Sequence, residues 1–434
     1  MKLYDTLSTS PLIMLILIIV CPYLDLVLLY VVIKRNSDLN EILKKENLFE
    51  LFKNALKEVQ WQKIEYLLII MLLLLWSGFS CVGLGGDTFF GPQLPNGAKA
   101  KYLRSGFRFY MLSLLLFVPL MAYFKVLNFY NNFVTFAAYL NLFGIFLSIF
   151  LFIKGKYFPS NGYNRSSGNF IIDFFCGIEL NPRIGEHLDL KQMMICRFLM
   201  IIWQLILMMA WKANYELTNE SGEPNWAITA NVLIQSMFIA KFLYNEDLYM
   251  ATFDVVSEHF GFYSAWGFLL LPTFYPLPIL YLVKHSPIAG FGFIKFITVV
   301  AMGATMILLR FMNDNQRYMT RQTNGKFNIW GKPAKVINAV YTDENNKKVQ
   351  TVLLASGFWG WARHLNYTFE FGVFLCWSLP ASFESPIPYF PLFILLALLI
   401  HRVFRDENKC RIKYGEYWEE YCQLVPYRLI PYVY

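Results

Sequence analysis

Residues 126–153 read VLNFYNNFVTFAAYLNLFGIFLSIFLFI and hold no charged side chain over 28 positions. A helix needs about 20 predominantly apolar residues to cross the hydrocarbon layer of a bilayer. Two further runs, 66–86 and 260–283, are uncharged over 21 and 24 residues. These three stretches predict membrane-spanning helices.

The rest of the chain extends this pattern. Of its 434 residues, 56% are hydrophobic and 16% charged, with a mean hydropathy of +0.41, against about 45–50% and about 25% in soluble domains. Shorter or singly interrupted apolar runs lie at 6–24, 109–124, 198–211, 226–240, 286–309, 371–383 and 386–400. We therefore expect an all-α fold, a polytopic membrane helix bundle of about ten transmembrane helices.

The N-terminal run is too long for a cleavable signal, so we expect it to remain as an anchor. Basic residues gather at 34–63, 99–108 and 310–363, and by the positive-inside tendency these segments face the cytosol. The net charge of +8 then reflects this loop bias, and we expect no nucleic-acid partner. The seven cysteines show no Cys-x-x-Cys pair, and no metal is expected.

Three polar segments interrupt the apolar pattern. Residues 36–63 are amphipathic, which fits a helix at the membrane interface or one packed on its solvent side. The stretches 155–191 and 313–350 are candidate functional loops, or solvated connectors. In the second, AKVINAVYT (334–342), the turn DENN and KKVQTVLL (347–354) predict a short β-hairpin.

The C-terminal segment 401–434 combines arginines with aromatic rings. Arginine forks pair with phosphates and aromatic faces stack on bases, so the mixture favours a dinucleotide site. A basic tail attracted to anionic lipid is the alternative. The residues concerned are Arg402, Arg405, Arg411, Lys413, Arg428, Tyr414, Tyr417, Trp418, Tyr421 and Tyr427.

Ionisable residues beside or inside apolar sequence are functional candidates, because desolvating a charge is costly. Structural pairing with other helices is the alternative for each of them. Glu246 and Asp254 are eight residues apart, so they share one face if their segment is a continuous helix. The full set is Asp173, Glu179, Glu246, Asp254, Glu258, His259, Glu370 and Asp406.

Four blocks resemble the sterol reductase family, and most of all its 7-dehydrocholesterol reductase branch. They are GNFIIDFFCGIELNPR (168–183), NEDLYMATFDVVSEHFGFYSAWG (245–267), two strings within 313–367, and the segment from 401 to the end. The spellings SGFWG and IWGKP favour the Δ7 branch over the Δ14 branch.

The resemblance implies one sterol-reductase-like membrane domain over 1–434, in the endoplasmic reticulum. Its N-terminal half would be a scaffold, and 240–434 would hold a sterol and NADPH pocket. The implied function is NADPH-dependent reduction of a sterol ring double bond, as in cholesterol biosynthesis. The positions that match the family's cofactor contacts are Arg317, Arg321, Leu354, Trp359, Asn366, Tyr367, Asp406, Cys410, Arg411, Ile412, Lys413, Tyr414 and Tyr421.

An isolated alkene accepts hydride poorly, so an acidic group must protonate it as the cofactor delivers hydride. The candidate catalytic acids are Asp406, Glu246 and Asp254, with Tyr263 behind them. A sterol and the bilayer are the expected partners, and the sequence leaves the oligomeric state open.

The sequence also departs from the family pattern. Arg317 stands where lysine is common, Phe369 and Glu370 replace a Gly–Asp pair, and Phe238 and Lys241 replace tyrosine and aspartate. Three alternatives therefore remain: another specificity (Δ14 or side chain), a non-catalytic sterol-binding protein, or a membrane methyltransferase that uses S-adenosylmethionine.

Overall fold

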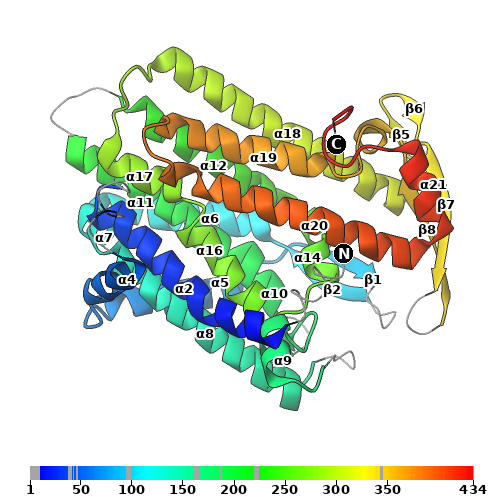
Figure 1. Cartoon of the computed structure of the whole chain (residues 1–434), viewed down its shortest axis with the longest axis horizontal. Coiled ribbons are helices and arrows are strands. Elements are labelled where there is room, and N and C mark those ends of the chain that lie inside the picture. The colour runs from blue at the N-terminus through cyan, green and yellow to red at the C-terminus, as the bar shows by residue number, and fades with distance from the viewer. Residues whose placement is uncertain are drawn as a thin grey trace. The chain divides into compact units, whose positions relative to one another are not determined.

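The computed structural model describes residues 10–37, 42, 44, 47–93, 99–160, 166–185, 188–218, 224–342 and 346–433. The chain forms two compact units. Unit 1 comprises Met1–Pro92, Lys99–Gly290 and Ala381–Pro388, and unit 2 comprises Gln93–Ala98, Phe291–Pro380 and Tyr389–Tyr434. The elements are labelled in Figure 1.

Unit 1 is built mainly from long apolar helices. They are α2 (Pro11–Lys34), α5 (Glu65–Val82), α6 (Gly106–Tyr123), α8 (Phe133–Tyr157), α11 (Met200–Thr218) and α12 (Trp226–Tyr244). In α5, Ile70 and Leu73 are buried whereas Leu72 and Leu75 are 65% and 67% exposed. A helix that is apolar on its exposed face as well requires lipid as its solvent.

The core of unit 1 lies around α11, whose Trp203 is fully buried. A π-helix (Met194–Leu199) precedes α11. Two other helices, α12 and α17 (Leu277–His285), pack against α11. Shorter helices complete the unit: α4 (Leu48–Lys57), α7 (Leu127–Asn131), α9 (Phe170–Cys176), α10 (Leu190–Met193), α13 (Glu246–Met250), α14 (Phe253–Val256), α15 (Phe262–Ala265) and α16 (Leu270–Thr273). Two small hairpins pair β1 (Asp87–Gln93) with β2 (Lys99–Arg104) and β3 (Arg183–Ile184) with β4 (Leu188–Asp189).

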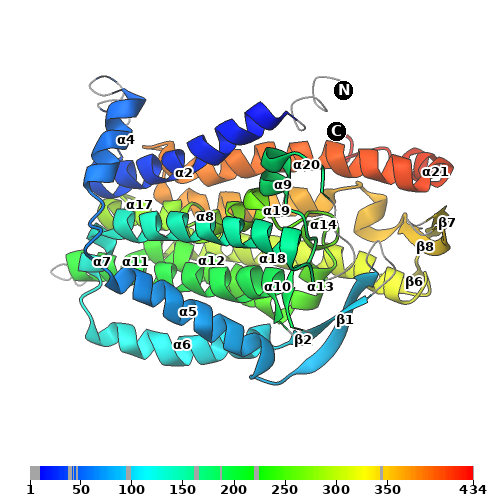
Figure 2. The same cartoon turned by 90° about the horizontal axis from the view of Figure 1, so that it is seen from below.

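Unit 2 centres on α18 (Phe293–Gln322), which lies along α19 (Leu365–Ser378) in Figure 1. Between these helices the chain forms the hairpins β5–β6 (Asn328–Ile329, Lys332–Pro333) and β7–β8 (Val336–Thr342, Lys348–Leu354), followed by a 3₁₀ turn at Gly357–Gly360. The chain ends with α20 (Phe390–Tyr414) and α21 (Glu416–Leu424). Figure 2 shows α21 beside the β7–β8 hairpin, which it contacts through β7.

The structure confirms a mostly helical membrane protein with small antiparallel hairpins. Within the described residues, eight helices are long and apolar enough to cross a membrane. The sequence prediction of about ten also counted the runs 109–124 and 371–383, which overlap the shorter helices α6 and α19. The hairpin expected after residue 334 is β7–β8, although turn residues 343–345 lie outside the described residues.

Two local expectations have specific outcomes. The amphipathic segment contains α4, which starts with a capping box: Asn47 accepts from Glu50 N at 2.9 Å, and Glu50 accepts from Asn47 N. Glu246 and Asp254 do not share one helix, because α13 ends at Met250 and Thr252 is extended (ψ 164°) before α14 begins.

Candidate cofactor-binding site

The last turns of α18 carry a line of polar side chains. Asn313, Arg317 and Arg321 follow at intervals of four residues, so each lies about 6 Å further along the same side of the helix. The guanidinium carbon of Arg317 lies 4.4 Å from the centroid of the Trp359 ring. This is a cation–π contact, and it joins α18 to the turn that follows β8.

The turn holds Trp359 through backbone contacts on both sides. Its indole N–H donates to the carbonyl of Asn313 at 2.8 Å, and its own carbonyl accepts from the Tyr421 hydroxyl at 3.2 Å. Gly357 has a positive φ of 64°, and a Cβ there would lie 2.4 Å from Gln316 Oε1. The glycine is therefore required for the turn to approach α18, where Phe358 N donates to Gln316 Oε1 at 3.0 Å.

Aromatic residues at the C-terminal end form a second side of the site. Tyr414, Trp418 and Tyr421 are buried together against Ile337 and Ala339 of β7. Leu354, at the end of β8, packs instead with Ile329 and Trp359. Because the Tyr421 hydroxyl bonds to the carbonyl of Trp359, the C-terminal aromatic residues are joined to the turn after β8.

Three cations converge on this structure. Arg321 and Lys413 lie close enough to repel one another, and Lys413 Nζ lies 4.0 Å from the centroid of the Tyr341 ring. Within the part of the chain that the structure describes, no Asp or Glu forms an ion pair with Arg317, Arg321 or Lys413. An anionic ligand would neutralise them.

The start of α19 adds polar groups. Asn366 donates from Nδ2 to Asp314 Oδ1 at 3.3 Å, while its Oδ1 is buried with no hydrogen-bond partner among the described residues. The Tyr367 ring stacks on His364, with centroids 5.4 Å apart and planes 13° apart. His364 Nδ1 lies 3.9 Å from Asp406 Oδ2, which connects this group to α20.

A buried ion network fixes the chain end near α19. Glu407 accepts from Arg363 Nε at 2.9 Å and from Arg428 Nε at 3.0 Å. Arg363 also donates from its Nη1 to the carbonyls of Val425 and Pro426, at 2.6 and 3.0 Å. Sequence reasoning missed this network, because its members pair across α19, α20 and the C-terminal residues.

These groups fit a phosphorylated dinucleotide. Arginine forks suit phosphate oxygens, and NADPH carries a 2′-phosphate and a pyrophosphate. The unpartnered Asn366 Oδ1 is a free acceptor for an amide or hydroxyl. Among the described residues, no group of three or more His, Cys, Asp or Glu side chains is arranged to hold a metal ion.

The comparison with known proteins decides the family. Residues 6–434 match the ergosterol biosynthesis ERG4/ERG24 family. The chain belongs to this sterol reductase family. Its members are NADPH-dependent oxidoreductases, and the chain is an enzyme of that class.

Individual relatives carry two different names. The chain is 34% identical over 376 residues to the 7-dehydrocholesterol reductase of Arabidopsis thaliana, covering 83% of this chain and 85% of the relative. It is 34% identical over 354 residues to the Xenopus laevis protein of that name (80% and 74%). It is also 34% identical over 358 residues to the Delta(14)-sterol reductase of Methylotuvimicrobium alcaliphilum (80% and 78%). Relatives of both names thus match this chain at the same identity.

The structure of this sterol reductase separates the expected cofactor contacts into two groups. Most belong to the cluster described above, including Cys410, which packs on its aromatic residues. Arg411, Ile412 and Lys413 are all exposed on the last turn of α20, Ile412 by 79%, but Lys413 lies over the Tyr341 ring beside the cluster. A contiguous stretch of helix presents successive residues to different sides.

Of the candidate acids, Glu246 belongs to unit 1 and is fully buried. Its carboxylate lies 2.5 Å from Arg197 Nη1 and accepts from Gly106 N at 3.2 Å. This buried ion pair ties Glu246 to Arg197, which favours a structural role for Glu246.

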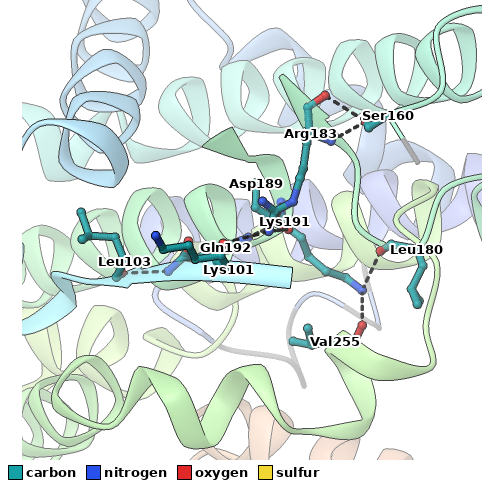
Figure 3. Close-up of polar contacts among 9 residues, drawn as sticks. All are labelled: Lys101, Leu103, Ser160, Leu180, Arg183, Asp189, Lys191, Gln192 and Val255. Atoms are coloured by element: carbon teal, nitrogen blue, oxygen red, sulfur yellow. Dashed lines mark hydrogen bonds and ion pairs between the residues drawn. The ribbon is translucent and has the colours of Figure 1, made fainter. Parts of the chain in front are cut away.

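Asp254, also in unit 1, lies in a segment held by a buried lysine. Lys191 Nζ donates to the carbonyls of Asp254 and Glu258 at 2.7 and 2.5 Å, and also to those of Leu180 and Val255. Figure 3 shows the last two contacts, together with Asp189, which caps the start of α10 by accepting from Lys191 N at 3.0 Å. The hydrogen bonds from Lys191 therefore fix the backbone position of Asp254.

The departures from the family pattern are accommodated in each unit. In unit 2, Glu370 pairs with Arg310 at 3.2 Å, and the Phe369 ring packs edge-on against Phe358 at 5.7 Å. In unit 1, Phe238 is buried 5.9 Å from the Trp203 ring. Phenylalanine at these two positions thus contributes to packing.

Proposed function

We propose that this reductase uses NADPH to reduce the Δ7 double bond of 7-dehydrocholesterol-type sterols, with the cofactor bound at the cluster around Trp359. The observation that carries the cofactor site is a group of three cations, Arg317, Arg321 and Lys413, that lie beside buried aromatic rings and pair with no carboxylate among the described residues. The relatives named 7-dehydrocholesterol reductase, together with SGFWG and IWGKP, support the Δ7 choice.

NADPH supplies the hydride. In the proposed mechanism Arg321 and Lys413 hold phosphate, Arg317 holds the next phosphate while stacked on Trp359, and Asn366 and Asp406 bind hydroxyl or amide groups. One of Asp406, Glu246 and Asp254 donates the proton to the second alkene carbon. We further propose one functional domain over 1–434, with 240–434 binding sterol and cofactor, in the endoplasmic reticulum membrane and in cholesterol-type sterol biosynthesis.

The cofactor assignment is tested with purified protein in detergent. Arg321→Ala should weaken NADPH binding at least tenfold, because a phosphate loses a charge-assisted partner, and NADH affinity should change less. Lys332→Ala removes an exposed cation of β6 and serves as the control. Wild-type NADPH affinity in Arg321→Ala would overturn the proposed site.

Isosteric amide variants of the three candidate acids test which one donates the proton. The proton donor, changed to its amide, should lose about 10²-fold or more in turnover. NADPH affinity should be kept in Glu246→Gln and Asp254→Asn, whereas Asp406→Asn also alters a proposed cofactor contact and should weaken NADPH binding. Glu246→Gln should lower thermal stability as well, because it leaves Arg197 buried without its partner. Full turnover in all three variants would exclude them as donors.

Δ14 reduction is the second candidate, favoured by the 34% identity to a Delta(14)-sterol reductase. The test is expression in cells blocked at Δ7 reduction and in cells blocked at Δ14 reduction, followed by sterol profiling. Loss of the conjugated ring-B diene absorbance supports the Δ7 proposal. Loss of a Δ14 alkene alone would replace it with the second candidate.

A further inference from the structure

Asn313 has a buried side chain whose polar atoms find no partner in the described part of the chain. The residue is 1% exposed, and neither its Oδ1 nor its Nδ2 has a hydrogen-bond partner among the residues that the structure describes. Its backbone carbonyl accepts from Trp359 Nε1. Sequence reasoning did not select Asn313.

The neighbours of Asn313 on the buried side of α18 are satisfied. Gln316 Oε1 accepts from Phe358 N at 3.0 Å, and the Thr320 hydroxyl donates to the carbonyl of Gln316 at 2.7 Å. Burying a carboxamide without partners costs free energy, and native proteins rarely accept this cost away from functional sites. The unpaired amide of Asn313 therefore calls for a ligand.

The position of Asn313 indicates which part of a ligand it meets. Along α18 the side chains become more exposed from Asn313, which is buried, through Arg317, which is half-buried, to Arg321, which is exposed. The cations stand at the open end of this line and the uncharged carboxamide at the closed end. NADPH has a matching order, with the 2′-phosphate on its adenosine half, the pyrophosphate in the middle and the nicotinamide, which is uncharged in the reduced cofactor, at the far end.

We propose that Asn313 binds the carboxamide of the nicotinamide ring of the cofactor. This rests on the proposed NADPH site. One amide offers the other both a donor and an acceptor, which matches the two unpaired atoms of Asn313. Asn366, whose Oδ1 is also unpartnered, supplies a second acceptor from α19. Asn313 is thus a specificity residue for the nicotinamide half of NADPH.

The variant Asn313→Leu should raise the stability of the ligand-free protein but lower its affinity for NADPH. Leucine has a similar volume and no polar atoms, so the ligand-free protein should melt at a higher temperature. The dissociation constant for NADPH should rise about tenfold through the lost hydrogen bonds. Asn313→Ala, which cannot clash, should show the same rise and guards against a packing artefact.

A ligand fragment locates the contact. Adenosine 2′,5′-bisphosphate lacks the nicotinamide, so Asn313→Leu should bind it as the wild type does, whereas Arg321→Ala should not. Ser378→Ala is the matched control, since its hydroxyl is also buried without a described partner. Ser378 lies twelve residues beyond Asn366 on the same helix, about 18 Å away along the axis.

These measurements distinguish the role of Asn313 from the proposed NADPH-dependent function. If wild-type protein fails to bind NADPH, the proposed function falls. If wild-type protein binds NADPH and Asn313→Leu binds it equally well, the inference is overturned and the cofactor site stands. Equal losses for NADPH and for the bisphosphate in Asn313→Leu would also overturn the assignment to the nicotinamide half.

Discussion

The Arg317 guanidinium carbon lies 4.4 Å from the centroid of the Trp359 ring. The planar guanidinium covers the indole face, and the indole N–H is fixed on α18 by the carbonyl of Asn313. The charge of Arg317 is therefore held in one orientation before any ligand arrives. Such preorganisation lowers the entropic cost of binding.

The first prediction concerns this pair. Arg317→Lys keeps the charge but loses the flat stacking surface and the fork, so NADPH affinity should fall about three- to tenfold. Arg317→Ala should lose more. Isothermal titration of detergent-solubilised protein measures both, and equal affinities in wild type and Arg317→Lys would show that the stacking contributes nothing to binding.

The second prediction concerns Tyr421, whose hydroxyl donates to the carbonyl of Trp359. Tyr421→Phe keeps the buried ring and should cost about 1 kcal/mol of stability, the usual contribution of one hydrogen bond. Tyr421→Ala should cost about 3–5 kcal/mol by leaving a cavity in the aromatic cluster. Thermal denaturation compares the two, and similar losses for both would contradict the packing role of the ring.

The third prediction concerns Glu407, which lies between Arg363 and Arg428. Glu407→Gln should destabilise the protein by about 3–5 kcal/mol, because both guanidinium groups lose the charge that compensates them. The control is Glu58→Gln, which breaks the more exposed ion pair with Lys34 and should cost less than about 1 kcal/mol. A small effect at Glu407 would mean that other contacts, such as the backbone hydrogen bonds of Arg363 and His364 with Tyr427 and Arg428, hold the C-terminal residues.

The fourth prediction is a pH dependence from His364. Burial lowers the pKa of His364 to about 3, Arg363 acts in the same direction, and Glu407 opposes them. In the unfolded chain the imidazole titrates near 6.5, so between these values the unfolded state binds the extra proton. Stability is therefore complete above about pH 6.5 and falls as the pH drops toward 3.

His364→Gln should flatten this dependence. Melting temperatures measured from pH 7.5 to 5 test it, with the variant losing less stability than the wild type over that interval. Parallel curves for the two proteins would contradict a neutral buried imidazole.

The fifth prediction concerns Lys191 in unit 1, whose ammonium donates to the carbonyls of Leu180, Asp254, Val255 and Glu258. Figure 3 shows the contacts with Leu180 and Val255. Lys191→Met keeps the stem but leaves buried carbonyls unsatisfied, so it should destabilise the protein by at least about 2 kcal/mol. Lys101→Met, an exposed position on β2, should have little effect. Undiminished stability in Lys191→Met would show that the carbonyls find other donors.

The membrane spans and the β7–β8 hairpin were predictable because each follows from a local pattern: long uncharged runs, and two β-rich strings around a turn. The pairing of Glu407 with Arg363 and Arg428 was not, because it joins residues up to 65 positions apart (363 to 428). The sequence also showed no sign that the helix is interrupted at Thr252, an extended residue that separates Glu246 from Asp254.

The candidate site shows the same division. The resemblance selected Arg317, Arg321, Trp359 and Tyr421, which the structure brings together in unit 2. It also selected Ile412, which is exposed. The spacing of Asn313 from Arg317 and Arg321 was visible in the sequence, but the signal that marks it, an amide buried without partners, exists only in the folded chain.

The mutual repulsion of Arg321 and Lys413 has a consequence for handling the protein. Sulfate or inorganic phosphate in a purification buffer would settle between the two cations and raise the melting temperature, as any ligand of the folded state does. The same ions would compete with NADPH and make it seem a weaker ligand than it is. Buffers with bulky monovalent anions would avoid this competition.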